Sequence, residues 1–97
     1  MAEVFFTELA DEQLTRLEAN ANLGRLLARV EEVLDQLEQD PGQEQLRRHE
    51  YRQLLEWKLA YEVAVQGNSE NWVLLWTWHE DQPGNVVVIY LGAPPGG

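Results

Sequence analysis

Residues 22–42 read NLGRLLARVEEVLDQLEQDPG, and this stretch decides the fold. Its apolar side chains recur with a period of 3.6 residues over about four turns, which predicts an amphipathic helix. These side chains are Leu23, Leu26, Leu27, Val30, Val33, Leu34 and Leu37. Asn22 is the expected N-cap. Asp40-Pro41-Gly42 should end the helix, because proline cannot continue the hydrogen-bond ladder and glycine suits the exit.

A shorter helix is predicted before this one. Ala10, Leu14, Leu17 and Ala21 fall at positions i, i+4, i+7 and i+11, which form one stripe of an amphipathic helix. The apolar segment 3–7 ends at a hydroxyl residue, so we expect a brief strand that leads into a helix N-cap. The short connection 20–22 favours an antiparallel helical hairpin.

After Gly42 the apolar period changes from 3.6 to 2, which predicts strands. The expected strands are 57–65, 72–78 and 86–91, with 51–55 as one more, and the turns between them lie at 67–69 and 82–85. The strand 86–91 should pair with 72–78 within the chain rather than with a strand of a partner protein or a second copy. Trp72, Trp76 and Trp78 should share one strand face with Leu74.

The predicted fold class is therefore α+β, a helical hairpin packed on a three- to four-stranded antiparallel sheet. The 97 residues correspond to a single domain, with residues 93–97 as a disordered tail. On the sheet we expect Leu27, Val30, Leu34 and Leu37 to be buried with Tyr61 or Trp76.

Composition limits the function. The chain carries a formal charge of −10 and has no cysteine, which excludes disulfides and thiolate catalysis and fits a cytoplasmic location. No run of about eighteen apolar residues is present to span a membrane. Ser69 is the only serine and lacks the context of a serine nucleophile. His79-Glu80-Asp81 has poor geometry for one metal, because neighbours on a strand point to opposite faces, so we expect no metal and no cofactor.

The basic residues are concentrated in one segment. Residues 1–40 carry ten acids and three arginines, and residues 61–97 carry four acids and no lysine or arginine. The remaining four bases are Arg47, Arg48, Arg52 and Lys58, close to His49, Tyr51 and Trp57. A basic strand interleaved with aromatics is suited to holding a phosphate backbone, or a partner, through Arg47, Arg48 and Tyr51. The alternative is that these arginines pair with the acidic helix faces.

Three segments, taken in order, resemble the RelE/ParE toxin superfamily. They are residues 3–17, the end of the second helix at LEQDP, and the strand WKLAYEV at 57–63, which is followed by an apolar strand that ends at His79. The resemblance implies a small α+β fold with a helical hairpin on an antiparallel sheet. It also implies a toxin of a two-gene toxin–antitoxin module, held by an antitoxin protein. RelE-like members cut mRNA on the ribosome, and ParE-like members poison DNA gyrase.

The same resemblance implies three catalytic residues. Lys58 takes the position of the family's strand arginine, which contacts the scissile phosphate. Arg52 lies where members keep bases that stabilise transition-state charge, and His79 matches the closing acid or base. A ribose 2′-hydroxyl would attack the adjacent phosphate, and this reaction needs cations and a proton donor. If this chemistry is retained, the three side chains should converge on one concave face.

After His79 the sequence departs from the family pattern. Glu80 and Asp81 follow it, and Tyr90 is the next tyrosine. Three interpretations therefore stay open, one of which is a small domain unrelated to toxins. Another is a toxin with a degenerate active site, whose target is ribosomal mRNA or DNA gyrase. The third is a non-catalytic protein-interaction module on the same fold, with a homodimer among its forms.

Overall fold

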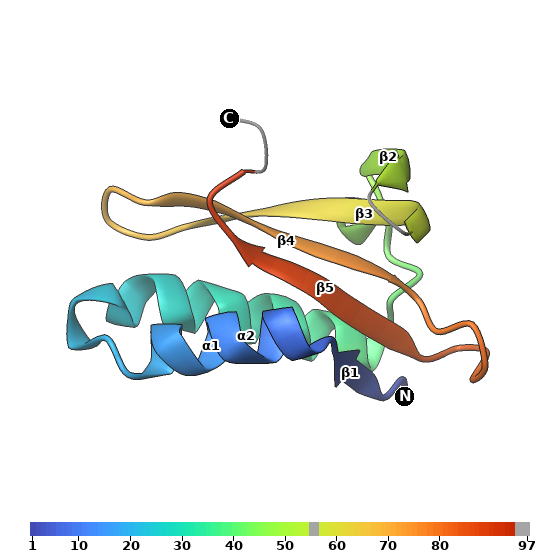
Figure 1. Cartoon of the computed structure of the whole chain (residues 1–97), viewed down its shortest axis with the longest axis horizontal. Helices are drawn as coiled ribbons and strands as arrows, with labels where there is room; N and C mark the ends of the chain where they lie inside the picture. The colour runs from blue at the N-terminus through green and yellow to red at the C-terminus, as the bar shows by residue number, and fades with distance from the viewer. Residues whose placement is uncertain (55–56, 95–97) are drawn as a thin grey trace.

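A computed structural model describes residues 1–54 and 57–94, with side chains for all of these except residues 53, 54, 57 and 58. The described elements follow one another along the chain (Figure 1). They are β1 (Val4–Phe6), α1 (Glu8–Glu18), α2 (Gly24–Gln39), β2 (His49–Leu54), β3 (Trp57–Gln66), β4 (Asn71–Trp78) and β5 (Val86–Gly92), with short 3₁₀ turns η1 (Ala21–Leu23) and η2 (Glu44–Leu46). The α+β class is thereby confirmed.

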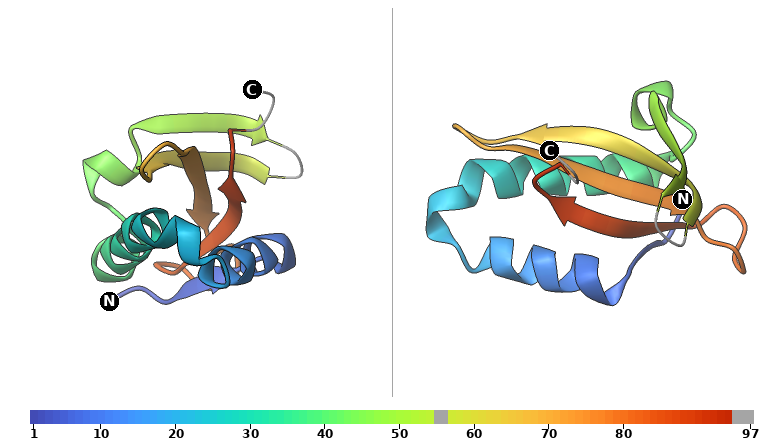
Figure 2. Two further views of the ribbon diagram at one scale, coloured as in Figure 1. Left: turned by 90° about the vertical axis from the view of Figure 1, so that its left-hand side faces the viewer. Right: turned by 45° about the horizontal axis from the view of Figure 1, so that its top comes forward.

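The sheet differs from the predicted one in its number of strands and in their direction. In the described chain it has five strands in the order β1-β5-β4-β3-β2. β1 pairs with β5 in parallel, Val4 opposite Val86, whereas the other neighbours are antiparallel. The sheet is therefore mixed, and the prediction of a purely antiparallel sheet of three or four strands was wrong. Both helices lie on one face of the sheet, as predicted (Figure 2).

The helix ends explain the hairpin. The Thr7 hydroxyl accepts a hydrogen bond from the backbone N–H of Ala10 at 3.2 Å, which confirms the predicted cap of α1. The expected cap of α2 at Asn22 was wrong. Asn20 instead caps η1, its side chain accepting from the N–H of Asn22 at 3.0 Å, and α2 begins at Gly24 without a side-chain cap.

The main core lies between the helices and the sheet. Val30 and Leu37 are buried there, and Leu27 and Leu34 are half-buried against the same cluster, so the predicted stripe is confirmed with two of its members partly exposed. The largest buried side chain is Trp76, whose ring contacts Tyr61 at a centroid distance of 4.7 Å. Trp72, Trp78 and Leu74 belong to this cluster as well, which confirms the shared strand face.

The other side of the sheet, here called the outer face, carries a second, smaller cluster. Its buried members are Ala60, Val73, Leu75 and Ile89. A shift in the pairing of β4 with β5 leaves Ile89 without an opposite residue, because Leu75 faces Tyr90 and Trp76 faces Val88. Consecutive residues of β5 then contact the same cluster, as the extra residue of a β-bulge requires.

Two strand predictions concern the edges of the sheet. The pairing of 86–91 with 72–78 within the chain is confirmed by the register of β5 on β4. The strand predicted at 51–55 is β2, which begins two residues earlier, at His49. Leu55 lies outside the described residues, as do residues 95–97 of the predicted tail.

Leu37 and Leu34 offer a matched test of this packing. Leu37 is fully buried, so Leu37→Ala should lower the free energy of unfolding by about 2–5 kcal/mol. Leu34→Ala should cost less, because part of the Leu34 side chain is already exposed to water. Urea denaturation of both variants measures the difference. Equal midpoints for the two variants would contradict the packing described here.

Candidate functional site

The predicted nucleic-acid or partner residues lie together at one edge of the sheet. β2 is the last strand of the sheet and pairs only with β3 among the described elements. Residues 47–52, here called the basic edge, are all exposed. They include Arg47, Arg48, His49, Tyr51 and Arg52. A positively charged strip is therefore open to solvent on a protein that is otherwise strongly acidic.

Each arginine of the basic edge has a different environment. The Arg47 guanidinium donates to the Gly42 carbonyl through Nε at 3.2 Å and Nη2 at 2.8 Å, which ties it to the start of the α2–β2 connection. Arg52 pairs with Glu50 at 3.1 Å, in an exposed pair that adds little stability. The predicted pairing of these arginines with the acidic helix faces is not seen among the described side chains.

Arg48 and His49 line a groove of about 400 Å³ between α2 and β3. Arg29 and Glu32 of α2 also line this groove and pair with each other at 2.8 Å. Glu62 of β3 lines it as well. The groove therefore mixes both signs of charge. It is suited to a polar partner surface more than to a bare phosphate chain, which needs an excess of cations.

Tyr51 is fixed by a residue that the sequence did not single out. Its hydroxyl donates to Glu62 Oε2 at 2.7 Å, across the outer face of the sheet. That hydrogen bond, with partial desolvation and the carboxylate charge, raises the pKa of Tyr51 above its ordinary value. The alternation of residues along a strand does not predict this contact. It follows from the register of β2 on β3, in which Tyr51 pairs with Ala60 and Glu62 lies diagonally beside it.

His79 has a structural role that limits its chemistry. Its Nδ1 accepts hydrogen bonds from the backbone N–H groups of Asp81 and Gln82, at 3.1 and 3.2 Å. Nδ1 therefore acts as a hydrogen-bond acceptor for the turn that follows β4. The ring also contacts Phe5 of β1 at a centroid distance of 4.9 Å. Glu80 and Asp81 line the same small hollow of about 180 Å³, and their carboxylates would repel a phosphate there.

The structure does not bring Arg52 and His79 together. Arg52 stands opposite Leu59, whose side chain packs toward the helices, so Arg52 projects from the helix side of the sheet. Phe5, the partner of His79, stands opposite Val87, which packs on the outer-face cluster. The two side chains therefore belong to opposite faces. Lys58 is a residue of β3, but its side chain lies outside the described ones.

Other site types were sought within residues 1–54 and 57–94. No group of three histidine or carboxylate side chains in this part of the chain is arranged to hold a metal ion. Neither described helix combines the length and the apolar character needed to cross a membrane. The chemistry available at the basic edge is therefore charge, hydrogen bonding and the exposed ring of Tyr51.

Comparison with protein-family models, curated proteins and solved structures gives no match to this chain. The RelE/ParE resemblance thus stays a prediction, and function has to be argued from the placement of the side chains. Two features of the molecule bear on its function. The basic edge is exposed as a strip, and His79 and Arg52 lie on different faces.

The Tyr51–Glu62 contact predicts a measurable titration. Glu62→Gln should lower the pKa of Tyr51. The Glu62 carboxylate accepts the phenol proton in a hydrogen bond and repels the tyrosinate anion, whereas a neutral amide carries no charge to repel it. The folded-state pKa is raised, so the stabilisation from this contact is complete below the ordinary tyrosine pKa of about 10 and is lost as pH rises through the higher value.

Absorbance titration of tyrosinate in the wild type, Glu62→Gln and Tyr51→Phe assigns the transition to Tyr51. Glu18→Gln, on the exposed end of α1, is the control and should leave the titration unchanged. A Tyr51 transition that does not move in Glu62→Gln would show that the contact is absent in solution.

Proposed function

We propose that this protein is a RelE/ParE-like toxin component of a type II toxin–antitoxin module with a degenerate active site. In this proposal it acts by binding its cellular target, and an antitoxin protein holds it in check. The observation that carries the proposal is the exposed basic edge on a sheet backed by a helical hairpin. The order of the elements, with a strand and two helices before the main strands, agrees with the family's architecture.

Three features argue against RNA cleavage as the mode of action. Arg52 and His79 lie on opposite faces of the sheet, so they cannot flank one phosphate. The Nδ1 atom of His79 is occupied by two backbone donors, and two carboxylates stand next to the ring. The charge of −10 also opposes approach to ribosomal RNA. A target reached through protein contacts, as for gyrase-directed members, fits these features better than scissile RNA.

The second candidate is a non-catalytic interaction module on the same fold. The groove beside Arg48 favours it, because its mixture of charged and apolar lining residues resembles a protein-binding surface more than an active site. The two candidates make different predictions in cells. A toxin arrests growth when its antitoxin is absent, whereas an interaction module leaves growth unchanged.

Induced expression tests the first candidate. Expression of the chain alone should arrest growth, and co-expression of the gene beside it should restore growth. Arg48→Glu should weaken the arrest because it reverses the charge of the basic edge. Arg25→Glu makes the same change of charge on an exposed residue in the first turn of α2, away from that edge, and should leave the arrest intact. Normal growth with wild-type protein present at high level would favour the interaction module.

RNA cleavage on translating ribosomes provides the second test. Wild type, Lys58→Ala and His79→Ala should all leave mRNA intact under conditions where a known RNA-cleaving toxin cuts it. The physical reason is the separation of Arg52 from His79 described above. Strong cleavage by wild type that either substitution abolishes would show instead that the three residues form an active site.

A further inference from the structure

A second groove lies where β1 and the segment before it meet the C-terminal half of α2. Its volume is about 670 Å³, larger than that of the groove beside Arg48. Val4, Phe6 and Leu34 give it half-buried apolar walls, and the exposed Glu3 and Glu38 stand at its rim. The groove therefore combines apolar walls with two carboxylates.

Backbone hydrogen bonds hold the walls of this groove in place. The N–H of Ala2 donates to the carbonyl of Glu38 at 2.7 Å, which fastens the segment before β1 to the last turn of α2. On the other side, the N–H of Glu3 donates to Asn85 Oδ1 at 2.9 Å, and the N–H of Val86 donates to the Glu3 carbonyl at 3.1 Å. The groove is therefore preformed, which lowers the cost of filling it.

The lining of the groove carries two carboxylates, those of Glu3 and Glu38, and one cation, the α-amino group of Met1, so its net charge is negative. Glu31, Leu34, Asp35 and Glu38 follow one another at i, i+3, i+4 and i+7 on α2, so three carboxylates flank the one leucine. The last turn of α2 contains no basic residue, although a helix C-terminus carries partial negative charge and favours cations. The last turn of α2 thus supplies no cation of its own, and the Arg47 guanidinium beyond the helix end is bound to the Gly42 carbonyl.

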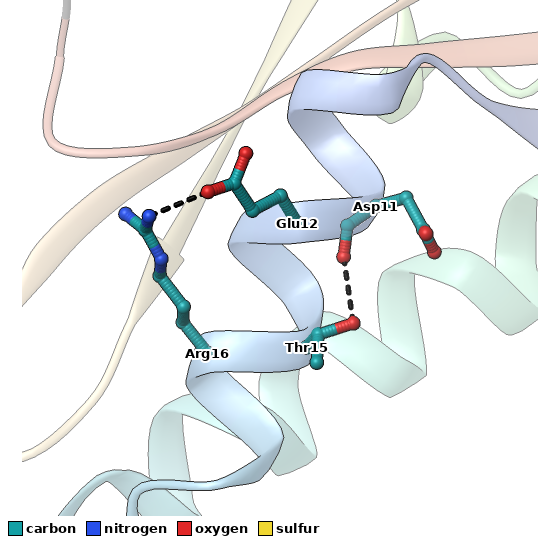
Figure 3. Close-up of polar contacts among 4 residues, drawn as sticks. All are labelled: Asp11, Glu12, Thr15 and Arg16. Carbon is teal, nitrogen blue, oxygen red and sulfur yellow. Dashed lines mark hydrogen bonds and ion pairs between the residues drawn. The ribbon is translucent and has the colours of Figure 1, made fainter.

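The arginines of the helices do not neutralise this region. Arg16 pairs with Glu12 one turn away on α1 (Figure 3), and Arg29 pairs with Glu32 on a different stripe of α2. Arg25 is in the first turn of α2, about 20 Å along the helix from Glu38 at a rise of about 1.5 Å per residue. Among the described side chains, Glu3 and Glu38 form no ion pair.

We propose that this groove, bounded by β1 and the C-terminal half of α2, binds a basic amphipathic segment of a partner protein. The partner's apolar side chains would pack on Val4, Phe6 and Leu34, while its lysine or arginine side chains pair with Glu3 and Glu38. Nucleic acids and anionic lipids are repelled by the same carboxylates. A second copy of this chain is disfavoured, because each copy carries −10. The inference depends neither on the basic edge nor on toxicity.

The probe for this proposal is a fluorescent twelve-residue peptide with leucines on one helical face and lysines on the other. The matched peptide has glutamate in place of each lysine. Fluorescence anisotropy with the full chain should show binding of the lysine peptide only. Glu38→Lys and Glu3→Lys should each weaken that binding about tenfold or more. Glu18→Lys makes the same change of net charge at the exposed end of α1 and should change binding less than twofold.

Folding and location are checked in the same samples. Glu38→Lys places a cation at a helix C-terminus, so its thermal midpoint should equal or exceed that of wild type. Amide shifts in NMR spectra should move at Phe6, Leu34 and Asn85 when the lysine peptide is added. Sedimentation of the chain alone should show a monomer.

Four results would overturn the proposal. The first is absence of lysine-peptide binding, and the second is equal weakening by Glu18→Lys, which would indicate unspecific attraction to an acidic surface. The third is competition by free spermidine at the peptide's own concentration, which would indicate a polyamine site. The fourth is a dimer that Glu38→Lys dissociates, which would show that a second copy fills the groove.

Discussion

The indole of Trp76 joins the sheet to the connection between α2 and β2. Its ring is fully buried between Tyr61 and Trp78, at centroid distances of 4.7 and 5.3 Å, and its N–H donates to the carbonyl of Leu46 at 2.9 Å. A buried indole N–H without that acceptor would lower the stability of the folded protein. The hydrogen bond therefore fixes the position of η2 relative to β4. Arg47 follows Leu46 directly, and the basic edge therefore begins from a point set by the core.

The charges of the molecule are separated by its architecture. The two helices carry eight of the seventeen acids on one side of the sheet, while β2 carries the basic edge at the far end of the strand order. The two grooves lie on different parts of this distribution. The groove beside Arg48 has two arginines and two glutamates, and the groove beside Glu38 has two glutamates and the α-amino group of Met1. Such a protein presents two surfaces of different electrostatic preference, which allows two partners to bind without competing for one site.

Periodicity predicted the parts of the fold in which one face is buried. The leucine and valine stripe of α2 and the tryptophan face of β4 were correct because burial imposes a period. The parallel pairing of β1 was not predictable, since three apolar residues carry no signal for the edge they join. The helix cap was predicted at Asn22, but the capping side chain is that of Asn20, because the 3₁₀ turn η1 comes between α1 and α2. For the site, sequence identified the exposed basic edge, but the separation of Arg52 from His79 depends on register, which no local pattern encodes.

The parallel pairing of β1 with β5 has a consequence for synthesis on the ribosome. Val4 and Val86 are opposite each other although 82 positions separate them in the chain, so β1 can pair with β5 only after three other strands and two helices have been made. The helical hairpin and the β2–β3–β4 meander use nearer contacts and can form earlier. The groove at Glu38 needs Asn85 for its wall and is therefore assembled late. A partner that recognises this groove would distinguish finished chains from nascent ones.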